Sequence, residues 1–132
     1  MFNKEETEES IATFKKALFG EPLEYQIEKN RFNKMGKASG QLVGGNLSIL
    51  YSLTGSEILP NLRNAILFFE DLDEYLYHID RMMMNLKHNK YFEGLSGLIV
   101  GGMTSMHDNA IPFGKNAKEI IIIIMYKLII VI

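Results

Sequence analysis

The chain of 132 residues is 47% hydrophobic and 23% charged, which is typical of a single globular domain with a hydrophobic core. Its formal net charge of −2, without a cluster of lysine and arginine, excludes a typical nucleic-acid-binding surface. The chain contains no cysteine, so disulfides, thiolate catalysis and cysteine-ligated zinc sites are excluded. This composition fits a reducing compartment, and we expect the protein to be cytoplasmic.

Neither end of the chain predicts insertion into a membrane. Met1–Ser10 is acidic, whereas a secretory signal begins with basic residues and an apolar run. Ile120–Ile132 is strongly apolar, but its 13 residues include Lys127 and fall short of the roughly 20 that a spanning helix needs. We therefore expect no membrane partner.

The first quarter of the chain predicts a helix followed by a strand. Asn3 and Glu6 form a capping-box pattern, and apolar residues then recur at helical spacing, which predicts a helix over Lys4–Phe19. Gly20 is a natural end for this helix. Leu23–Ile27 alternates between apolar and polar residues and predicts a half-buried strand.

A second strand is predicted over Ala38–Val43. The sequence Gly44-Gly45-Asn46 then breaks the strand pattern and indicates a tight turn. Asn46 is well suited to cap a short helix that runs to Leu53, because its side chain can accept a backbone hydrogen bond.

The second half of the chain alternates strands and helices. Ala65–Phe69 is a continuous apolar run, typical of a strand that is buried on both faces. A helix is predicted over Glu74–Lys87, a buried strand over Leu95–Val100 that ends at Gly101-Gly102, and a last helix from near Lys115. This alternation predicts an α/β fold whose parallel strands are joined by right-handed crossovers.

The predicted helix over Glu74–Lys87 has an apolar and a polar face. On the polar face, Glu74 is placed to pair with His78, and Tyr77 with Arg81, at i,i+4 spacing. The apolar face comprises Tyr75, Ile79, Met82, Met83 and Leu86, and we interpret the consecutive Met82, Met83 and Met84 as core residues.

The most informative stretch is A-I-L-F-F-E-D-L-D-E-Y-L-Y-H-I-D-R at Ala65–Arg81, where a buried strand runs directly into carboxylates. Strand-to-helix turns at the carboxyl end of a sheet are where α/β proteins often hold functional side chains. Glu70 is the first of these acids, and from the residues alone a solvated acid that caps the next helix is the favoured interpretation. His88 is expected to be solvated, and His107 beside Asp108 is only a weak indication of a metal pair.

Two further patterns are interpreted as structural. The glycine pairs at Gly44 and Gly101 lack the spacing of a phosphate-binding loop, so tight turns are expected there. Ser48 and Ser52 lie on a predicted helix without a histidine nearby in sequence, so we expect neither to be a nucleophile.

Three stretches resemble the C-terminal part of LD-carboxypeptidases (muramoyltetrapeptide carboxypeptidases), a family of serine peptidases. They are G-Q-L-V-G-G-N-L-S-I-L at Gly40–Leu50, L-F-F-E-D-L-D-E-Y-L-Y-H-I-D-R-M at Leu67–Met82 and G-L-I-V-G-G-M-T at Gly97–Thr104. The resemblance extends over about Phe14–Glu119. The family, which is similar to the microcin-C self-immunity peptidases, cleaves L–D peptide bonds of muropeptides in murein recycling, and uses no metal or other cofactor.

The resemblance implies a three-layer β/β/α swivelling domain. In that architecture a mainly parallel sheet carries helices on one face and a smaller strand layer on the other. It assigns residues 1–22 to a helix and linker from the nucleophile domain, and residues 23–119 to the C-terminal domain. Residues 120–132 form an isoleucine-rich tail that is atypical of the family.

The resemblance also implies which residues act. Glu70 corresponds to the glutamate of a Ser-His-Glu triad, which would orient the imidazole and stabilise the imidazolium. Gly44, Gly45 and Asn46 correspond to a loop beside the substrate, and no residue corresponds to a metal ligand. The chain lacks the Gly-x-Ser-x-Gly elbow of the nucleophile, and Ile120–Ile132 stands where the family has its histidine. We therefore expect a C-terminal fragment, produced by an early stop or a frame change, that supplies the glutamate and is inactive alone.

A second hypothesis is a non-catalytic domain. It would bind a muropeptide at Gly44–Asn46, or pair with another subunit through Ile120–Ile132, which is rich in β-forming residues and poor in charge. The partners expected under the two hypotheses are a peptide substrate, the N-terminal nucleophile domain, or a second copy of the chain.

Overall fold

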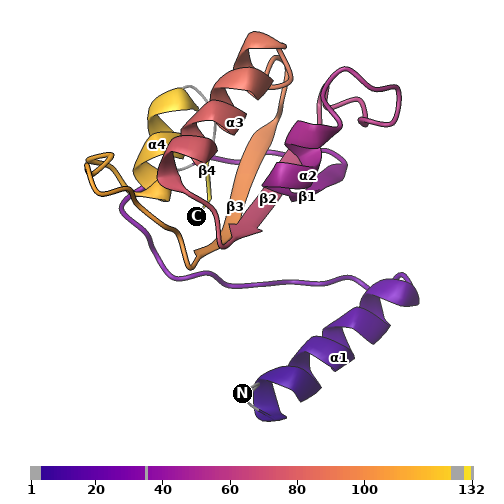
Figure 1. Ribbon diagram of the computed structural model, residues 1–132. Helices are drawn as coiled ribbons and strands as arrows, with labels where there is room; N and C mark the ends of the chain where they lie inside the picture. Colours follow the sequence, from indigo (N-terminus) through magenta and orange to yellow (C-terminus); the bar gives the residue numbers. More distant parts are fainter. Residues whose placement is uncertain (1–3, 35, 126–129, 132) are drawn as a thin grey trace.

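The computed structural model describes residues 4–34, 36–125 and 130–131. Helices and strands alternate along the chain, and the four strands are parallel and lie in the order β1-β2-β3-β4 (Figure 1). The α/β class predicted from the sequence is therefore confirmed. The elements are α1 (Lys4–Leu18), β1 (Leu42–Asn46), α2 (Leu47–Ser52), β2 (Ile66–Leu72), α3 (Leu76–His88), β3 (Gly97–Thr104), α4 (Ala117–Ile124) and β4 (Ile130–Val131).

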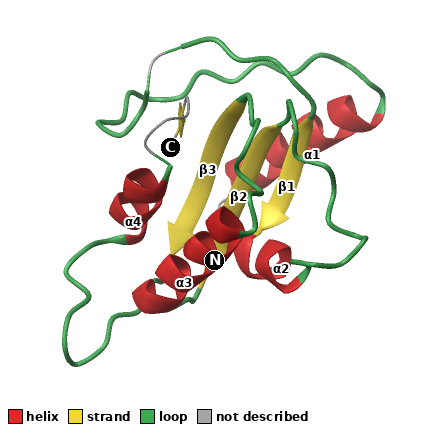
Figure 2. Ribbon diagram, turned by 90° about the horizontal axis from the view of Figure 1, so that it is seen from above, coloured by secondary structure: helices red, strands yellow, loops and turns green. Residues whose placement is uncertain are grey.

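The core lies between the sheet and one layer of helices. Leu67 and Phe69 of β2 are buried and alternate with half-buried residues. Helices α2, α3 and α4 lie on the same side of the sheet (Figure 2). From α3, Ile79, Met82, Met83 and Leu86 are buried against this face, as the helical spacing predicts. Tyr75, which we also expected on this apolar face, is 43% exposed because it is the N-cap and precedes the helix.

The other face of the sheet differs from the expected architecture. Outside the one sheet, the described residues form no second strand layer. Leu23–Ile27, predicted as a strand, is irregular and exposed, because alternation alone does not make a strand without a neighbour to pair with. Helix α1 forms as predicted but lies apart from the sheet in Figure 1, and its apolar residues Phe14 and Leu18 are 62% and 66% exposed.

Both glycine pairs lie inside strands, so the prediction of tight turns was wrong. The first strand runs over Leu42–Asn46 instead of Ala38–Val43, and Gly44 pairs in register with Phe68. A Cβ added at Gly44 would lie 1.7 Å from the carbonyl oxygen of Phe68, so glycine serves here for the close approach of two strands. Strand β3 likewise continues through Gly101 and Gly102 to Thr104.

The isoleucine-rich segment contributes to the core. Helix α4 begins at a capping box, in which the Asn116 side chain accepts from the Glu119 backbone N–H and the Glu119 carboxylate accepts from that of Asn116, both at 3.0 Å. Ile120 and Ile121 follow within the same helix and are buried. The expected division of the chain after Glu119 therefore falls inside α4. Residues 126–129 and 132 of the expected tail, and Asn3 of the predicted N-terminal capping box, lie outside the described residues.

Candidate active site at the carboxyl edge of the sheet

Glu70 lies near the carboxyl end of β2, opposite an irregularity in β3. Phe69 pairs with Val100 and Asp71 with Met103, so Gly101 and Gly102 together stand opposite Glu70. This extra residue forms a β-bulge, a feature that is common beside active sites because it redirects a side chain.

Gly101 leaves room for the Glu70 side chain. A Cβ added at Gly101 would lie 3.0 Å from Cβ of Glu70 and 3.0 Å from Cε2 of Phe68. Glu70 is half-buried, and within the described part of the chain its carboxylate makes no hydrogen bond or ion pair. Its oxygens are therefore available to accept a hydrogen bond from another group.

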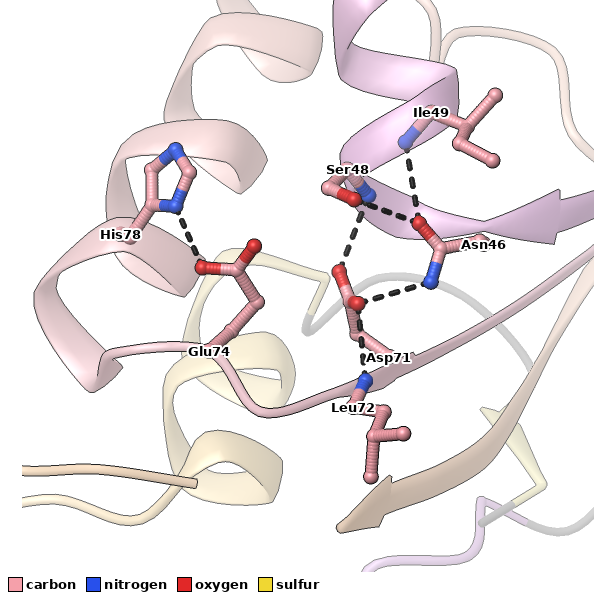
Figure 3. A network of polar contacts seen from close by, with 7 residues as sticks. All are labelled: Asn46, Ser48, Ile49, Asp71, Leu72, Glu74 and His78. Carbon is pink, nitrogen blue, oxygen red and sulfur yellow. Dashed lines mark hydrogen bonds and ion pairs between the residues drawn. The ribbon is translucent and has the colours of Figure 1, made fainter. Parts of the chain in front are cut away.

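Asn46 is the last residue of β1 and pairs in register with Glu70 of β2. Its side chain connects the end of β1 to α2 and to β2. As the N-cap of α2, its side-chain oxygen accepts from the backbone N–H of Ile49 at 3.1 Å and from the hydroxyl of Ser48 at 2.6 Å (Figure 3). Its amide nitrogen donates to the Asp71 carboxylate at 2.8 Å. The cap predicted for α2 is confirmed, and the side chain of Ser48 has a structural partner.

The carboxylate of Asp71 is the group that ties the two strand ends together. It is 2% exposed and accepts from the Asn46 amide, from the backbone N–H of Ser48 at 3.0 Å and from that of Leu72 at 2.9 Å (Figure 3). These donors satisfy a charge whose burial would otherwise be costly. Sequence reasoning missed Asp71, although the period of two along β2 places it on the same buried face as Leu67 and Phe69.

Gly45 borders an open space at this edge of the sheet. A Cβ added there would meet no atom within 4 Å. Of the predicted substrate-side residues, Gly44 is packed against β2, whereas Gly45 and Asn46 lie at the strand end beside Glu70. The structure therefore brings Gly45 and Asn46 to the same edge as Glu70.

Two histidines are paired with carboxylates after β2. Nδ1 of His78 lies 2.7 Å from Oε2 of Glu74, which confirms the predicted i,i+4 pair. Nε2 of His107 lies 2.5 Å from Oδ1 of Asp73, so His107 pairs across the site and not with its neighbour Asp108.

Backbone hydrogen bonds anchor the segment after β3 to the turn after β2. The N–H of Leu76 donates to the carbonyl of His107 at 2.9 Å, and the N–H of His107 donates to the carbonyl of Glu74 at 2.8 Å. His88 is exposed, as predicted. Among the residues that the structure describes, no three histidine, aspartate or glutamate side chains are grouped to hold a metal ion. No helix of that part of the chain has the length and apolar character to cross a membrane.

Residues 39–131, which contain the sheet and all of these contacts, match a family model described as the LD-carboxypeptidase C-terminal domain. The chain is 46% identical over 65 residues to a probable murein peptide carboxypeptidase of Bacillus subtilis (strain 168), covering 49% of this chain and 20% of the relative. It is 39% identical over 71 residues to the microcin C7 self-immunity protein MccF of Escherichia coli, covering 53% and 21%. The chain thus spans about a fifth of the length of these relatives.

Solved structures match a larger share of the chain. The structure of MccF in complex with glutamyl sulfamoyl guanosine has a TM-score of 0.65 and 28% identity, covering 75% of this chain and 30% of that one. A muramoyltetrapeptide carboxypeptidase from Oxalobacter formigenes has a TM-score of 0.60 and 26% identity, covering 69% and 32%. The family match extends past Glu119 through α4 and β4. The chain therefore belongs to the LD-carboxypeptidase family and contains that family's C-terminal domain.

Proposed function

We propose that the chain contributes the acid to a serine-type LD-carboxypeptidase site, which hydrolyses the L–D peptide bond of muropeptides in the cytoplasm. Glu70 is the triad acid, and Gly44, Gly45 and Asn46 lie beside the substrate. The observation that carries the proposal is the position of Glu70. Its carboxylate has no partner among the described residues, stands opposite a glycine bulge, and is in register with Asn46.

The chemistry assigned to Glu70 is orientation of an imidazole. In a serine peptidase, the hydroxyl of serine attacks the peptide carbonyl while an imidazole removes its proton and later gives it to the leaving amine. The triad acid accepts the other N–H of the imidazole, fixes its tautomer and stabilises the imidazolium. No group of the described residues bonds to the carboxylate of Glu70, so its oxygens can accept this hydrogen bond.

The substrate class is supported by the relatives. The Bacillus subtilis relative is described as a murein peptide carboxypeptidase, and the Oxalobacter formigenes structure is a muramoyltetrapeptide carboxypeptidase. The histidines of the described segments are committed elsewhere or exposed, since His78 pairs with Glu74 and His107 with Asp73. We propose that the 132-residue chain alone does not hydrolyse muropeptides, because acyl transfer needs a nucleophile and a base beside the acid.

A chimera with the Bacillus subtilis relative tests this proposal. Residues 39–104 of this chain replace the matching segment of that enzyme, which supplies the serine and the histidine. We expect the chimera to release the terminal D-amino acid from a muropeptide tetrapeptide, and Glu70→Gln to reduce kcat by about 10³-fold or more with little change in KM. Glu57→Gln, an exposed acid, is the matched control. Turnover by the 132-residue chain alone, or full activity of the Glu70→Gln chimera, would contradict the proposal.

A second function, muropeptide binding without catalysis, is favoured by one observation. Gly45 borders open space at the strand end beside Glu70. Binding of a muropeptide to the 132-residue chain that is unchanged by Glu70→Gln would support this function. The alternative of subunit pairing through the isoleucine-rich segment has less support, because Ile120, Ile121 and Ile124 are buried within the domain.

A further inference from the structure

A cavity lies at the amino end of the sheet, away from Glu70. It has a volume of about 370 Å³ and is formed by the segments that lead into β2 and β3, residues 59–63 and 90–93. Strand β2 begins at Ile66 and rises about 3.3 Å per residue, so Glu70 lies roughly 13 Å further along the sheet. The cavity therefore shares no lining residue with the candidate active site.

The two segments that form this cavity are hydrogen-bonded to each other, and each contributes a buried residue to the core. The backbone N–H of Asn64 donates to the carbonyl of Gly94 at 2.7 Å, and that of Ser96 donates to the carbonyl of Ala65 at 2.8 Å, so the two segments are joined by the backbone. Leu62 and Leu95, one from each segment, are buried in the core. These contacts fix the two segments next to each other.

The polar groups at the cavity are mostly donors. Arg63 and Lys90 line it, and neither has a carboxylate partner among the described residues. The hydroxyl oxygen of Tyr91 accepts from the backbone N–H of Gly55 at 3.1 Å, which leaves its own proton free to donate. The side-chain oxygen of Asn61 accepts from the N–H of Arg63 at 3.0 Å, and its amide nitrogen, which has no acceptor among the described residues, can donate as well.

The aliphatic part of the Arg63 side chain reaches from residues 59–63 to the segment that leads into β3. A Cβ added at Gly94 would lie 3.5 Å from Cγ of Arg63, so the side chain runs over the opposite segment. Glu93 is the one carboxylate among the lining residues. Two cations and two neutral donors against one acid give the cavity an excess of donors that suits an anion.

We propose that this cavity binds a small molecule that carries a carboxylate or phosphate group. Arg63 and Lys90 hold the anionic group, Tyr91 and Asn61 donate to it, and Leu59 and Pro60 contact the apolar part of the ligand. The site is independent of the proposed hydrolysis, because it uses none of the residues at the carboxyl edge of the sheet.

The test is a titration of the whole 132-residue chain, labelled with ¹⁵N, with inorganic phosphate, with acetate and with tetramethylammonium at constant ionic strength. We expect one of the anions to shift the amides of residues 59–63 and 90–93 with a dissociation constant of about 1 mM, and the cation to leave them unchanged. The more strongly bound anion identifies the ligand class as phosphate or carboxylate.

Variants of the cavity residues distinguish binding at this site from non-specific attraction of anions to the protein surface. Arg63→Gln and Lys90→Gln are each expected to weaken binding about tenfold, which corresponds to one charge-assisted hydrogen bond. Lys37→Gln removes an exposed lysine outside the cavity and is the matched control. Equal affinity of all these variants, or shifts spread over the whole surface, would overturn the proposal. Since Lys90 is exposed, its variant provides the test even if Arg63→Gln disturbs the fold.

Discussion

The side-chain amide of Asn46 donates to the buried carboxylate of Asp71 at 2.8 Å, and this contact joins the ends of two neighbouring parallel strands. Asp71 directly follows Glu70, the proposed acid, while Asn46 is the proposed substrate-side residue. Alternation along β2 turns Asp71 toward the helices and Glu70 toward the opposite face. The buried acid therefore joins the strand ends, whereas the half-buried acid has no hydrogen-bond partner among the described residues.

Replacement of Asp71 by asparagine is expected to lower the free energy of unfolding by about 1–3 kcal/mol. An amide has one acceptor oxygen, so it cannot accept from both Asn46 and the backbone N–H of Ser48, and its NH₂ group would face a donor. Urea unfolding measures the change, and Glu57→Gln, the same acid-to-amide change at an exposed position, is the control. An equal effect of the two substitutions would show that the network at Asp71 does not stabilise the fold.

Replacement of Gly101 by alanine is expected to reduce the activity of the chimera at least about tenfold. The added Cβ meets Cβ of Glu70 and Cε2 of Phe68 at 3.0 Å, so one of these groups must give by a few tenths of an ångström, and the proposed triad depends on the position of its acid. Gly102→Ala is the matched control, because its Cβ meets only Cγ2 of Thr104 at an ordinary 3.7 Å. If both alanine variants have the same kcat, Gly101 does not position Glu70.

The two glycines of β1 give a second matched pair. Gly44 and Gly45 have similar φ angles of +152° and +159°, so alanine is strained at both. Only at Gly44 does the added Cβ collide with β2, at 1.7 Å from the carbonyl oxygen of Phe68. We expect Gly44→Ala to be less stable than Gly45→Ala by about 1–3 kcal/mol in urea unfolding. Equal stabilities would mean that β1 can shift away from β2 without cost.

The sequence predicts those elements whose signal is local. The apolar run before Glu70 predicts β2, the helical spacing of Ile79 and Met83 predicts the buried face of α3, and Asn46 is recognised as a cap from its position. The alternation of Leu23–Ile27 is equally local, yet it gives no strand, because a strand also requires a partner that the sequence pattern does not specify.

The parts that could not be predicted depend on contacts between distant segments. Asn46 and Asp71 are 25 positions apart, and only the register of β1 and β2 places them in contact. The glycine pairs suggest turns because glycine is common in turns, whereas Gly44 and Gly101 serve close packing against Phe68 and Glu70. Family resemblance identifies Glu70, whereas the irregularity in β3 opposite it is not revealed by the sequence.

The isoleucines of α4 provide the last prediction. Ile121 is 0% exposed and Ile123 is 55% exposed on the same helix, so one packs in the core and the other faces outward. Ile121→Ala is expected to lower the free energy of unfolding by about 2–5 kcal/mol, because it leaves a cavity. Ile123→Ala removes the same atoms from the surface and is expected to change stability by no more than about 0.5 kcal/mol. Urea unfolding at two protein concentrations measures both effects. A large loss for Ile123→Ala that grows with protein concentration would instead indicate that this helix face pairs with another chain.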